Sequence, residues 1–500
     1  MNWLTKLPNN AESFTALTKG KLMLPLLVCT LLSAPAFSAG SSEYDAWRQQ
    51  TLGEFKRYLD ENDKAFLKQL QSDWKSVDLL RGEPVDSTPK PDALPSAPPP
   101  SVNVVTDETP LVKIQPADPD MVPAIPPAPV IPAAAGPVAE LSFYGYDLKV
   151  PYTRVMQTRF RDRPSPQAIA NYYETQATTD YQSTLEQLRQ WQQSLMLSDW
   201  ATAQLVALFA QNVVADDSSR TLLSWFLMLK MGFDARLAYN DQVWLLLPAD
   251  EPVYEVSFFT LNQTRYYAMP LRKPVTVSGS VSTYAGQYDK TLQPLRFGVP
   301  DHFTASGEDV RRTLSFYLHG EKKELHLVYP LEQIAYLDSL PQLDLKNYPV
   351  TGLPDGTRRM LLDELRVMLQ GSTEEEAVNQ LLTIVQTAFA YETDERQFRR
   401  ENYLYPLETL HYPASDCEDR ASLFALLVHE LLGLPVILTD YPGHVAAAVA
   451  LSGPAGGDNL TYHGTLYTIA DPTYVNARAG MTMPEFAGQS PALISPFETP

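Results

Sequence analysis

The stretch from Tyr412 to His444, YPASDCEDRASLFALLVHELLGLPVILTDYPGH, constrains the fold more than any other part of the chain. Apolar residues recur at helical spacing from Ala421 to Leu432, and the Gly and Pro that follow are typical of a helix C-terminus. With Ser415 or Asp416 as the predicted N-cap, Cys417 lies in the first helical turn. Unpaired N–H groups and the helix dipole favour negative charge there, so the sequence predicts a lowered thiol pKa.

Three strands are predicted after this helix, and two of them carry polar residues at their ends. The first covers Val436–Thr439, the second His444–Leu451, and the third Leu466–Ala470, which is followed by Asp471. A cysteine at a helix start, a histidine at the beginning of one strand and an aspartate after the next are the parts of a Cys-His-Asp triad.

The strings DCEDR, YPGH and ADPTY resemble the transglutaminase-like superfamily of papain-fold cysteine enzymes, specifically a bacterial exported branch with a DCEDR helix. The resemblance covers about residues 345–490. It implies an α+β fold in which the catalytic cysteine starts a helix that packs on an antiparallel sheet. It also implies Cys417 as nucleophile, His444 as general base and then acid, and Asp471 as the orienting carboxylate.

Charge and histidine spacing exclude two classes of function. The chain has 59 acidic and 39 basic side chains, a net charge of −20, and offers no cluster of Lys and Arg for nucleic acid. Its histidines lack a paired metal-ligand spacing, so we expect neither a metal site nor a cofactor.

The N-terminus has the layout of a secretory signal peptide over residues 1–38. Two lysines precede the apolar run Leu22–Leu32, and small residues follow at 34–39. The run is shorter than the ~20 residues of a spanning helix, so a periplasmic protein is favoured over one anchored in the inner membrane. Cleavage would remove Cys29 and leave Cys417 as the one thiol, which favours a reactive role for it.

Residues 41–82 are predicted to be an amphipathic helical segment. Its apolar residues at helical spacing are Trp47, Phe55, Leu59, Phe66, Leu70, Trp74 and Val77. The segment resembles the helical N-terminal extension of some envelope murein transglycosylases. Packing on the chain itself, binding to peptidoglycan or an envelope protein, and lying on a membrane surface all remain open.

Residues 83–138 are predicted to be a disordered linker. They contain 16 of the 42 prolines of the chain and few large apolar side chains. Such a composition does not bury enough surface to fold, so we expect an extended spacer.

Residues 139–272 are predicted to form an α+β domain that contains an inactive transglutaminase-like repeat. The segment Asp216–Leu247 repeats the order of polar start, apolar helix, glycine, strand, turn and strand. Counting from the glycine places Asp216 where the catalytic unit has its cysteine, and Val243 or Trp244 where it has its histidine. Met269 takes the place of the aspartate. A chance match of any helix followed by glycine and two strands is the alternative.

Residues 273–344 are predicted to be a β-rich insert with a hairpin turn near His319–Lys322, and residues 345–500 the catalytic domain. Helices are expected at Thr357–Gln370 and Thr373–Tyr391, the second capped by Ser372 with Glu375. The charged and aromatic stretch Tyr391–Pro413 either lines the cleft or is a solvated loop.

These features together predict an exported cysteine enzyme that acts on amide bonds through a thioester. A peptidase or amidase acting on envelope proteins or peptidoglycan peptides is favoured. A protein-crosslinking transglutaminase, in which a lysine amine resolves the thioester, is one alternative. A non-catalytic scaffold that binds peptides in the cell envelope is another.

Overall fold

The computed structural model describes residues 61–500 except 87, 89, 92, 94, 99–111, 116–135, 273, 274, 276, 278, 287, 290, 299, 300, 352, 454, 455 and 498–500. The predicted signal peptide and the first part of the amphipathic segment therefore lie outside the described residues. Among the described helices, none combines the length and the apolar character that crossing a membrane requires.

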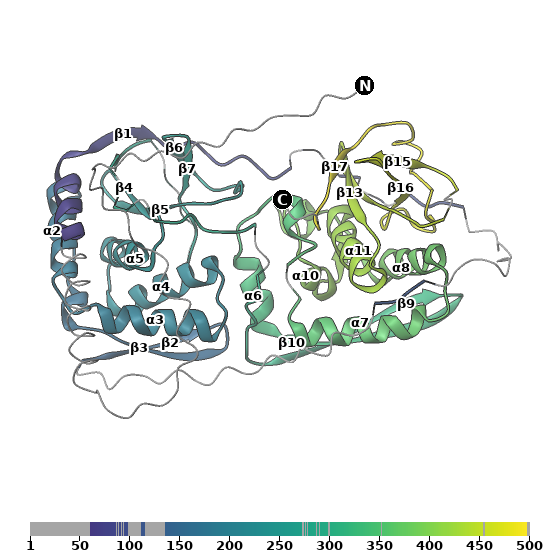
Figure 1. The fold of residues 1–500 in the computed structure, drawn as a ribbon, viewed down its shortest axis with the longest axis horizontal. Helices are drawn as coiled ribbons and strands as arrows, with labels where there is room; N and C mark the ends of the chain where they lie inside the picture. Colours follow the sequence, from purple (N-terminus) through teal and green to yellow (C-terminus); the bar gives the residue numbers. More distant parts are fainter. Residues whose placement is uncertain are drawn as a thin grey trace, which may run out of the picture. The chain divides into compact units, whose positions relative to one another are not determined.

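The fold is mixed α+β, and its larger sheets are antiparallel (Figure 1). The N-terminal half begins with a hairpin and four helices: β2 (Val138–Phe143), β3 (Tyr146–Pro151), the short 3₁₀ helix η1 (Arg154–Gln157), α2 (Pro166–Ala177), α3 (Gln182–Ser194), α4 (Asp199–Val213) and α5 (Asp217–Met231). A six-stranded sheet follows, in the order β1 (Trp74–Asp78), β8 (Ser280–Tyr284), β4 (Arg236–Tyr239), β5 (Val243–Pro248), β7 (Thr264–Tyr267) and β6 (Phe258–Leu261).

A long hairpin and three helices come next: β9 (Asp309–Leu318), β10 (Glu321–Pro330), α6 (Leu331–Ser339), the 3₁₀ turn η2 (Leu345–Asn347), α7 (Asp355–Leu369) and α8 (Glu374–Ala388). The hairpin turn is His319-Gly320, which confirms the predicted hairpin. The α8 cap is formed by Thr373 with Glu376. The predicted pair of Ser372 with Glu375 is therefore wrong by one residue, because the backbone N–H groups of the first turn meet the hydroxyl of Thr373.

The C-terminal half contains short elements, the longest helix and a second sheet. Before the sheet come β11 (Ala390–Tyr391), α9 (Asp394–Gln397), α10 (Pro406–His411), β12 (Ala414–Ser415) and α11 (Cys417–Leu432). The sheet has the order β15 (Asn459–Tyr462), β16 (Thr465–Ala470), β14 (His444–Val449), β13 (Val436–Tyr441) and β17 (Ala492–Ile494). The predicted helix and strands are confirmed at these places, and the helix already begins at Cys417.

The two sheets share one topology. We call residues 216–284 the α5 unit and residues 416–494 the α11 unit; Figure 1 draws them in teal and in yellow-green. The strand order β6-β7-β5-β4-β8 of the first has the same sequence of hairpins as β15-β16-β14-β13-β17 of the second. Each helix packs on the two strands that follow it and on an earlier helix, α4 or α8. The order of elements and the strand pairing are therefore the same in both units.

The amphipathic segment ends in a strand. Residues 61–72 are helical, and Phe66 and Leu70 are buried in the chain's own core. Asp63 of this helix binds Lys230 of α5, with 2.5 Å between Oδ1 and Nζ. Trp74 and Val77, which the spacing predicted to be helical, lie in β1 and pair with β8. The helical prediction is wrong for them because strand pairing supplies the backbone hydrogen bonds.

The range predicted as a disordered linker is partly docked. Val112 N donates to Ser372 O at 2.9 Å, and Ala97 N donates to Val475 O at 2.8 Å. Ala97 is buried among aromatic and Met side chains of the α11 unit. The expectation of a free spacer therefore does not hold for this part of the range, because its backbone forms hydrogen bonds with the folded chain. The described residues concerned are 86, 88, 90, 91, 93, 95–98 and 112–115.

Candidate functional site

Helix α11 presents Cys417 at its first position. Asp416 is the N-cap, and Gly433 ends the helix with a φ of 64°, a left-handed conformation that glycine adopts without strain. Most of the helix is buried, and Cys417 is 0% exposed. The helix packs on β14 and β13, two strands of the sheet that carries the predicted histidine.

His444 and Asp471 form a buried pair. His444 begins β14 and Asp471 follows β16, and the pairing of these strands brings the two side chains together. Nε2 of the imidazole lies 2.8 Å from Oδ2 of the carboxylate. Because a carboxylate only accepts hydrogen bonds, Nε2 carries the proton and Nδ1 is left as the basic nitrogen. This is the tautomer that a general base acting through Nδ1 requires.

Neighbouring groups hold this pair in place. Oδ1 of Asp471 accepts from the backbone N–H groups of Thr473 and Tyr474 at 2.9 and 3.1 Å. The ring of Phe486 stacks on the imidazole of His444, with 5.0 Å between centroids and 13° between planes. Gln386 of α8 donates from Nε2 to the carbonyl oxygen of Asp471 at 3.0 Å. The sequence analysis missed Gln386 and Phe486, because their contact with the pair depends on tertiary packing.

The thiol of Cys417 is bound to its neighbour in the chain. Sγ donates to Oε2 of Glu418 at 3.0 Å, and within the described residues no hydrogen bond joins it to His444. Burial and the negative charge of Glu418 raise the pKa of Cys417 well above its ordinary value, against the opposite effect of Lys90. The predicted lowering of this pKa is wrong, because the loss of solvation exceeds the effect of the helix N-terminus.

Five carboxyl groups form an acidic cluster around the start of α11: Asp394, Glu401, Asp416, Glu418 and Asp419. Burial, together with neighbouring carboxylates, raises the pKa of Asp394 to about 10 and that of Glu401 to about 8. Both carboxylate oxygens of Asp416 are buried without a hydrogen-bond partner. Burial and mutual repulsion therefore favour the neutral form of several of these carboxyl groups.

Oxygen ligands of a hard cation are present in this cluster. The ligand atoms of Asp394, Asp416 and Asp419 lie within 4.8 Å of one another, as do those of Asp394, Glu401 and Glu418. Carboxylate oxygens at such spacing could hold an ion such as Ca²⁺. The expectation of no metal site rested on histidine spacing, and the segment that contains Asp394 and Glu401 was predicted to be a cleft wall or a solvated loop.

Lys90 supplies a positive charge to the cluster. Its Nζ lies 3.0 Å from Oε1 of Glu418, 3.4 Å from Glu401 and 3.2 Å from Asp86, and the side chain is only 3% exposed. Burial by itself would lower the pKa of Lys90. The negative charges of Glu418, Cys417 and Asp416 together have a larger effect in the opposite direction, so the pKa of Lys90 is raised. Lys90 was assigned to the linker, and no sequence pattern pointed to this contact.

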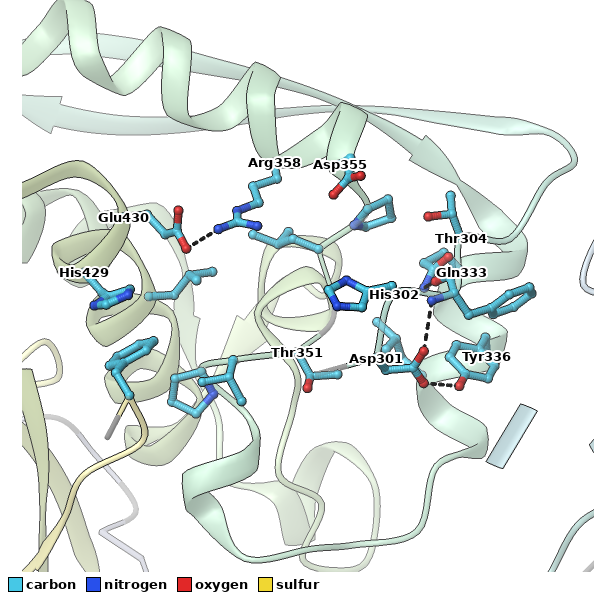
Figure 2. Close-up of a pocket in the computed structure, with 18 residues that line it drawn as sticks. Asp301, His302, Thr304, Gln333, Tyr336, Thr351, Asp355, Arg358, His429 and Glu430 are labelled. Atoms are coloured by element: carbon cyan, nitrogen blue, oxygen red, sulfur yellow. Dashed lines mark hydrogen bonds and ion pairs between the residues drawn. The ribbon is translucent and has the colours of Figure 1, made fainter. Parts of the chain in front are cut away.

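A cavity among the described residues lies elsewhere. It has a volume of about 260 Å³ and is lined by residues of α6, α7 and the end of α11. Figure 2 shows Arg358 turned toward Glu430 on one side and Asp301 bound to Tyr336 on the other. His429 on its wall is twelve residues after Cys417, about 18 Å along the helix axis at 1.5 Å per residue. The cavity is therefore separate from the triad residues.

No family model, no curated protein and no solved structure matches this chain. The argument for a function rests on the geometry of the site.

Proposed function

We propose that the chain is a cysteine acyl-transfer enzyme of transglutaminase-like type, with Cys417 as nucleophile, His444 as base and Asp471 as the orienting carboxylate. The observation that carries the proposal is the buried His444–Asp471 pair at 2.8 Å on the sheet against which the Cys417 helix packs. A histidine bound through Nε2 has its basic nitrogen free for a thiol.

The reaction follows from these roles. Nδ1 of His444 takes the thiol proton, and Sγ of Cys417 attacks the carbonyl carbon of an amide. The imidazolium then gives its proton to the leaving amine, and a thioester remains on the enzyme. Water resolves the thioester into the free acid and the thiol. This sequence requires that Sγ exchange its present hydrogen bond with Glu418 for one with His444.

The α5 unit supports the proposal by contrast. It has the same strand order and pairing, but it contains no cysteine or histidine and has Met269 in place of the aspartate. We propose that it is a second transglutaminase-like unit without catalytic residues, with a structural or recognitional role. The α11 unit, by contrast, has Cys, His and Asp at the three positions that the proposed chemistry needs.

A peptide-binding scaffold is the second candidate, because one observation favours it. Cys417 is 0% exposed, and its thiol donates to a carboxylate instead of to the histidine. A protein that holds peptides without cleaving them would have no need of an accessible thiol. The experiment must therefore detect covalent chemistry itself.

The test uses the full mature chain and an envelope protein fraction. Mass spectrometry should detect an acyl adduct on Cys417 that hydroxylamine removes, and new peptide termini in the fraction. The matched control is Cys417→Ala, which should give neither. Addition of methylamine distinguishes the two reactions, since a hydrolase yields acids and a transglutaminase yields methylamides. Absence of both adduct and cleavage from the wild type would favour the scaffold.

The proposed setting is the periplasm, with peptidase or amidase activity on envelope proteins or peptidoglycan peptides. This part rests on the N-terminal sequence and on the resemblance to exported bacterial enzymes. Mature protein isolated from cells should begin near residues 37–40, and intact Cys29 would favour the inner-membrane-anchored form.

A further inference from the structure

A segment of the chain itself contacts residues next to the cysteine and residues near the histidine. We call its described residues among 86–98 the cleft strap. At one end, Lys90 binds Glu418, the residue next to Cys417. At the other end, Ala97 is buried in the same apolar cluster as Phe486, whose ring stacks on His444. The strap therefore contacts both the cysteine side and the histidine side of the proposed active site.

The backbone of the strap is held as an extended peptide would be. Ala97 N donates to Val475 O at 2.8 Å, and Ser96 forms a parallel bridge with the same residue. Tyr391 donates from its hydroxyl to the carbonyl oxygen of Pro91 at 2.9 Å. Main-chain pairing of this kind recognises a peptide without regard to its side chains, so sequence preference must come from the pockets.

The pocket for Lys90 is built for a primary ammonium group. Glu418 binds the ammonium through Oε1 at 3.0 Å and the thiol of Cys417 through Oε2 at 3.0 Å, so one carboxylate links the two groups. Glu401 adds a second carboxylate, and the ring of Tyr403 lies 5.7 Å from Nζ. Glu418 is 0% exposed, so a ligand that displaced Lys90 without bringing a cation would leave a buried charge unpaired.

We infer that the pocket of Glu418, Glu401 and Tyr403 is the subsite for a lysine-type side chain of the substrate, and that the cleft strap fills it as an intramolecular competitor. The inference rests on the proposed function and names its substrate class: a peptide with a primary ammonium side chain close to the amide that is attacked. A protonated amine held by Glu418 is not nucleophilic, so the subsite serves recognition.

The test measures binding of a peptide with the sequence of residues 86–98, DSTPKPDALPSAP, to the full chain carrying Lys90→Ala. The comparison peptide is identical except that its lysine is acetylated, which removes the charge and keeps the length. We expect the lysine peptide to bind at least tenfold more tightly than the acetylated one. Glu418→Gln in the same chain should abolish that preference. Free lysine should bind more weakly than the peptide, because it lacks the backbone contacts of the strap.

A second measurement needs no substitution. In the wild-type chain, Lys90 should react slowly with an amine-acetylating reagent, whereas the exposed Lys113 should react readily. An excess of the lysine peptide should displace the strap and raise the labelling of Lys90 severalfold, without changing that of Lys113. The acetylated peptide should have no such effect. The control variant Lys113→Ala should bind the lysine peptide as the wild type does.

Two results would overturn the inference. One is equal binding of both peptides to the Lys90→Ala chain, and the other is unchanged labelling of Lys90 at saturating lysine peptide. Neither measurement depends on turnover. A lysine preference without any acyl adduct on Cys417 would thus refute the proposed catalysis and leave the ammonium subsite standing. An acyl adduct on Cys417 that forms equally well with peptides with and without a free lysine amine would support the proposed catalysis and refute the ammonium subsite.

Discussion

The α5 unit and the α11 unit have the same topology but different side chains at the three positions where the α11 unit has its proposed catalytic residues. Both helices end at a glycine with positive φ, Gly232 and Gly433, and both are followed by an antiparallel hairpin. The last paired residues of the hairpins are Tyr239 with Val243 and Tyr441 with His444. Of the two residues that the sequence left open for the histidine position, strand register favours Val243 over Trp244.

The third position agrees with this register. Tyr267 pairs with Leu247 in the α5 unit, and Ile469 pairs with Ala448 in the α11 unit. Two residues further along come Met269 and Asp471. The α5 unit thus has Val243 and Met269 where the α11 unit has histidine and aspartate. Its N-cap Asp216 corresponds to the N-cap Asp416, so Asp217 holds the first helical position, which is that of Cys417 in α11. The count from the glycine, which pairs Asp216 with Cys417, is off by one residue because α11 is one residue longer than α5. The same helix and sheet therefore form with different side chains at these three positions.

The helix starts also differ in how their charges are satisfied. Asp216 is an ordinary N-cap, whose carboxylate accepts from the backbone N–H of Ser219 at 2.9 Å and from its hydroxyl at 2.8 Å. Asp416 takes the same cap position in α11, and its two carboxylate oxygens have no hydrogen-bond partner among the described residues. In the α5 unit the N-cap carboxylate stabilises the helix through hydrogen bonds. In the α11 unit the N-cap carboxylate lies among other carboxyl groups instead.

The largest expected difference is in chemistry. Cys417→Ala should remove the acyl adduct completely, and His444→Ala should reduce its rate of formation on the order of 10⁴-fold. The carboxylate of Glu418, which accepts from the thiol, is a weaker base than imidazole, and against the effect of burial Lys90 holds its pKa below the ordinary value. The matched variants of the α5 unit, Asp217→Ala and Val243→Ala, should leave that rate within about twofold. Adduct formation is followed by mass spectrometry, and equal rates for His444→Ala and the wild type would break the distinction.

Matched core deletions should show that the two scaffolds are equivalent. Leu222 and Leu423 hold corresponding positions, ten residues before Gly232 and Gly433, and are 0% and 1% exposed. Truncation of either to Ala should lower the free energy of unfolding by about 2–5 kcal/mol. Denaturant unfolding measures both. A cost near zero for one of them would mean that its helix is not packed as its counterpart is.

Much of this scaffold follows from local sequence, whereas the electrostatics of the site do not. The spacing from Ala421 to Leu432, the small turn before His444 and the aspartate after the third strand predict the helix, its sheet and the His–Asp pair. Lys90 and Asp394 could not be placed, because they reach the start of α11 from segments far apart in the chain. Their contact is a property of packing, and so is the burial that raises the thiol pKa.

The thiol itself offers the next test. Glu418 and burial hold the pKa of Cys417 high, while Lys90 opposes them. Glu418→Gln removes the negative charge and keeps Lys90 nearby, so the thiol pKa should fall, and alkylation by iodoacetamide should begin at lower pH than in the wild type. The rate is measured from pH 6 to 10. Glu430→Gln on the same helix is the control and should leave the profile unchanged. An unchanged profile for Glu418→Gln would mean that burial alone sets the pKa.

The smallest expected effects are on the two acidic caps, and they should have opposite signs. Asp216→Ala removes a satisfied cap and should cost about 1 kcal/mol of unfolding free energy. Burial and neighbouring carboxylates raise the folded-state pKa of Asp416. Its contribution to stability is therefore largest at acidic pH, below the unfolded pKa of about 3.9, and is lost as pH rises toward the folded value. Asp416→Asn should accordingly become more stabilising, relative to the wild type, between pH 5 and pH 8. Urea unfolding of both variants at the two pH values measures this, and a constant difference for Asp416→Asn would mean that a cation or the Lys90 ammonium already neutralises the carboxylate.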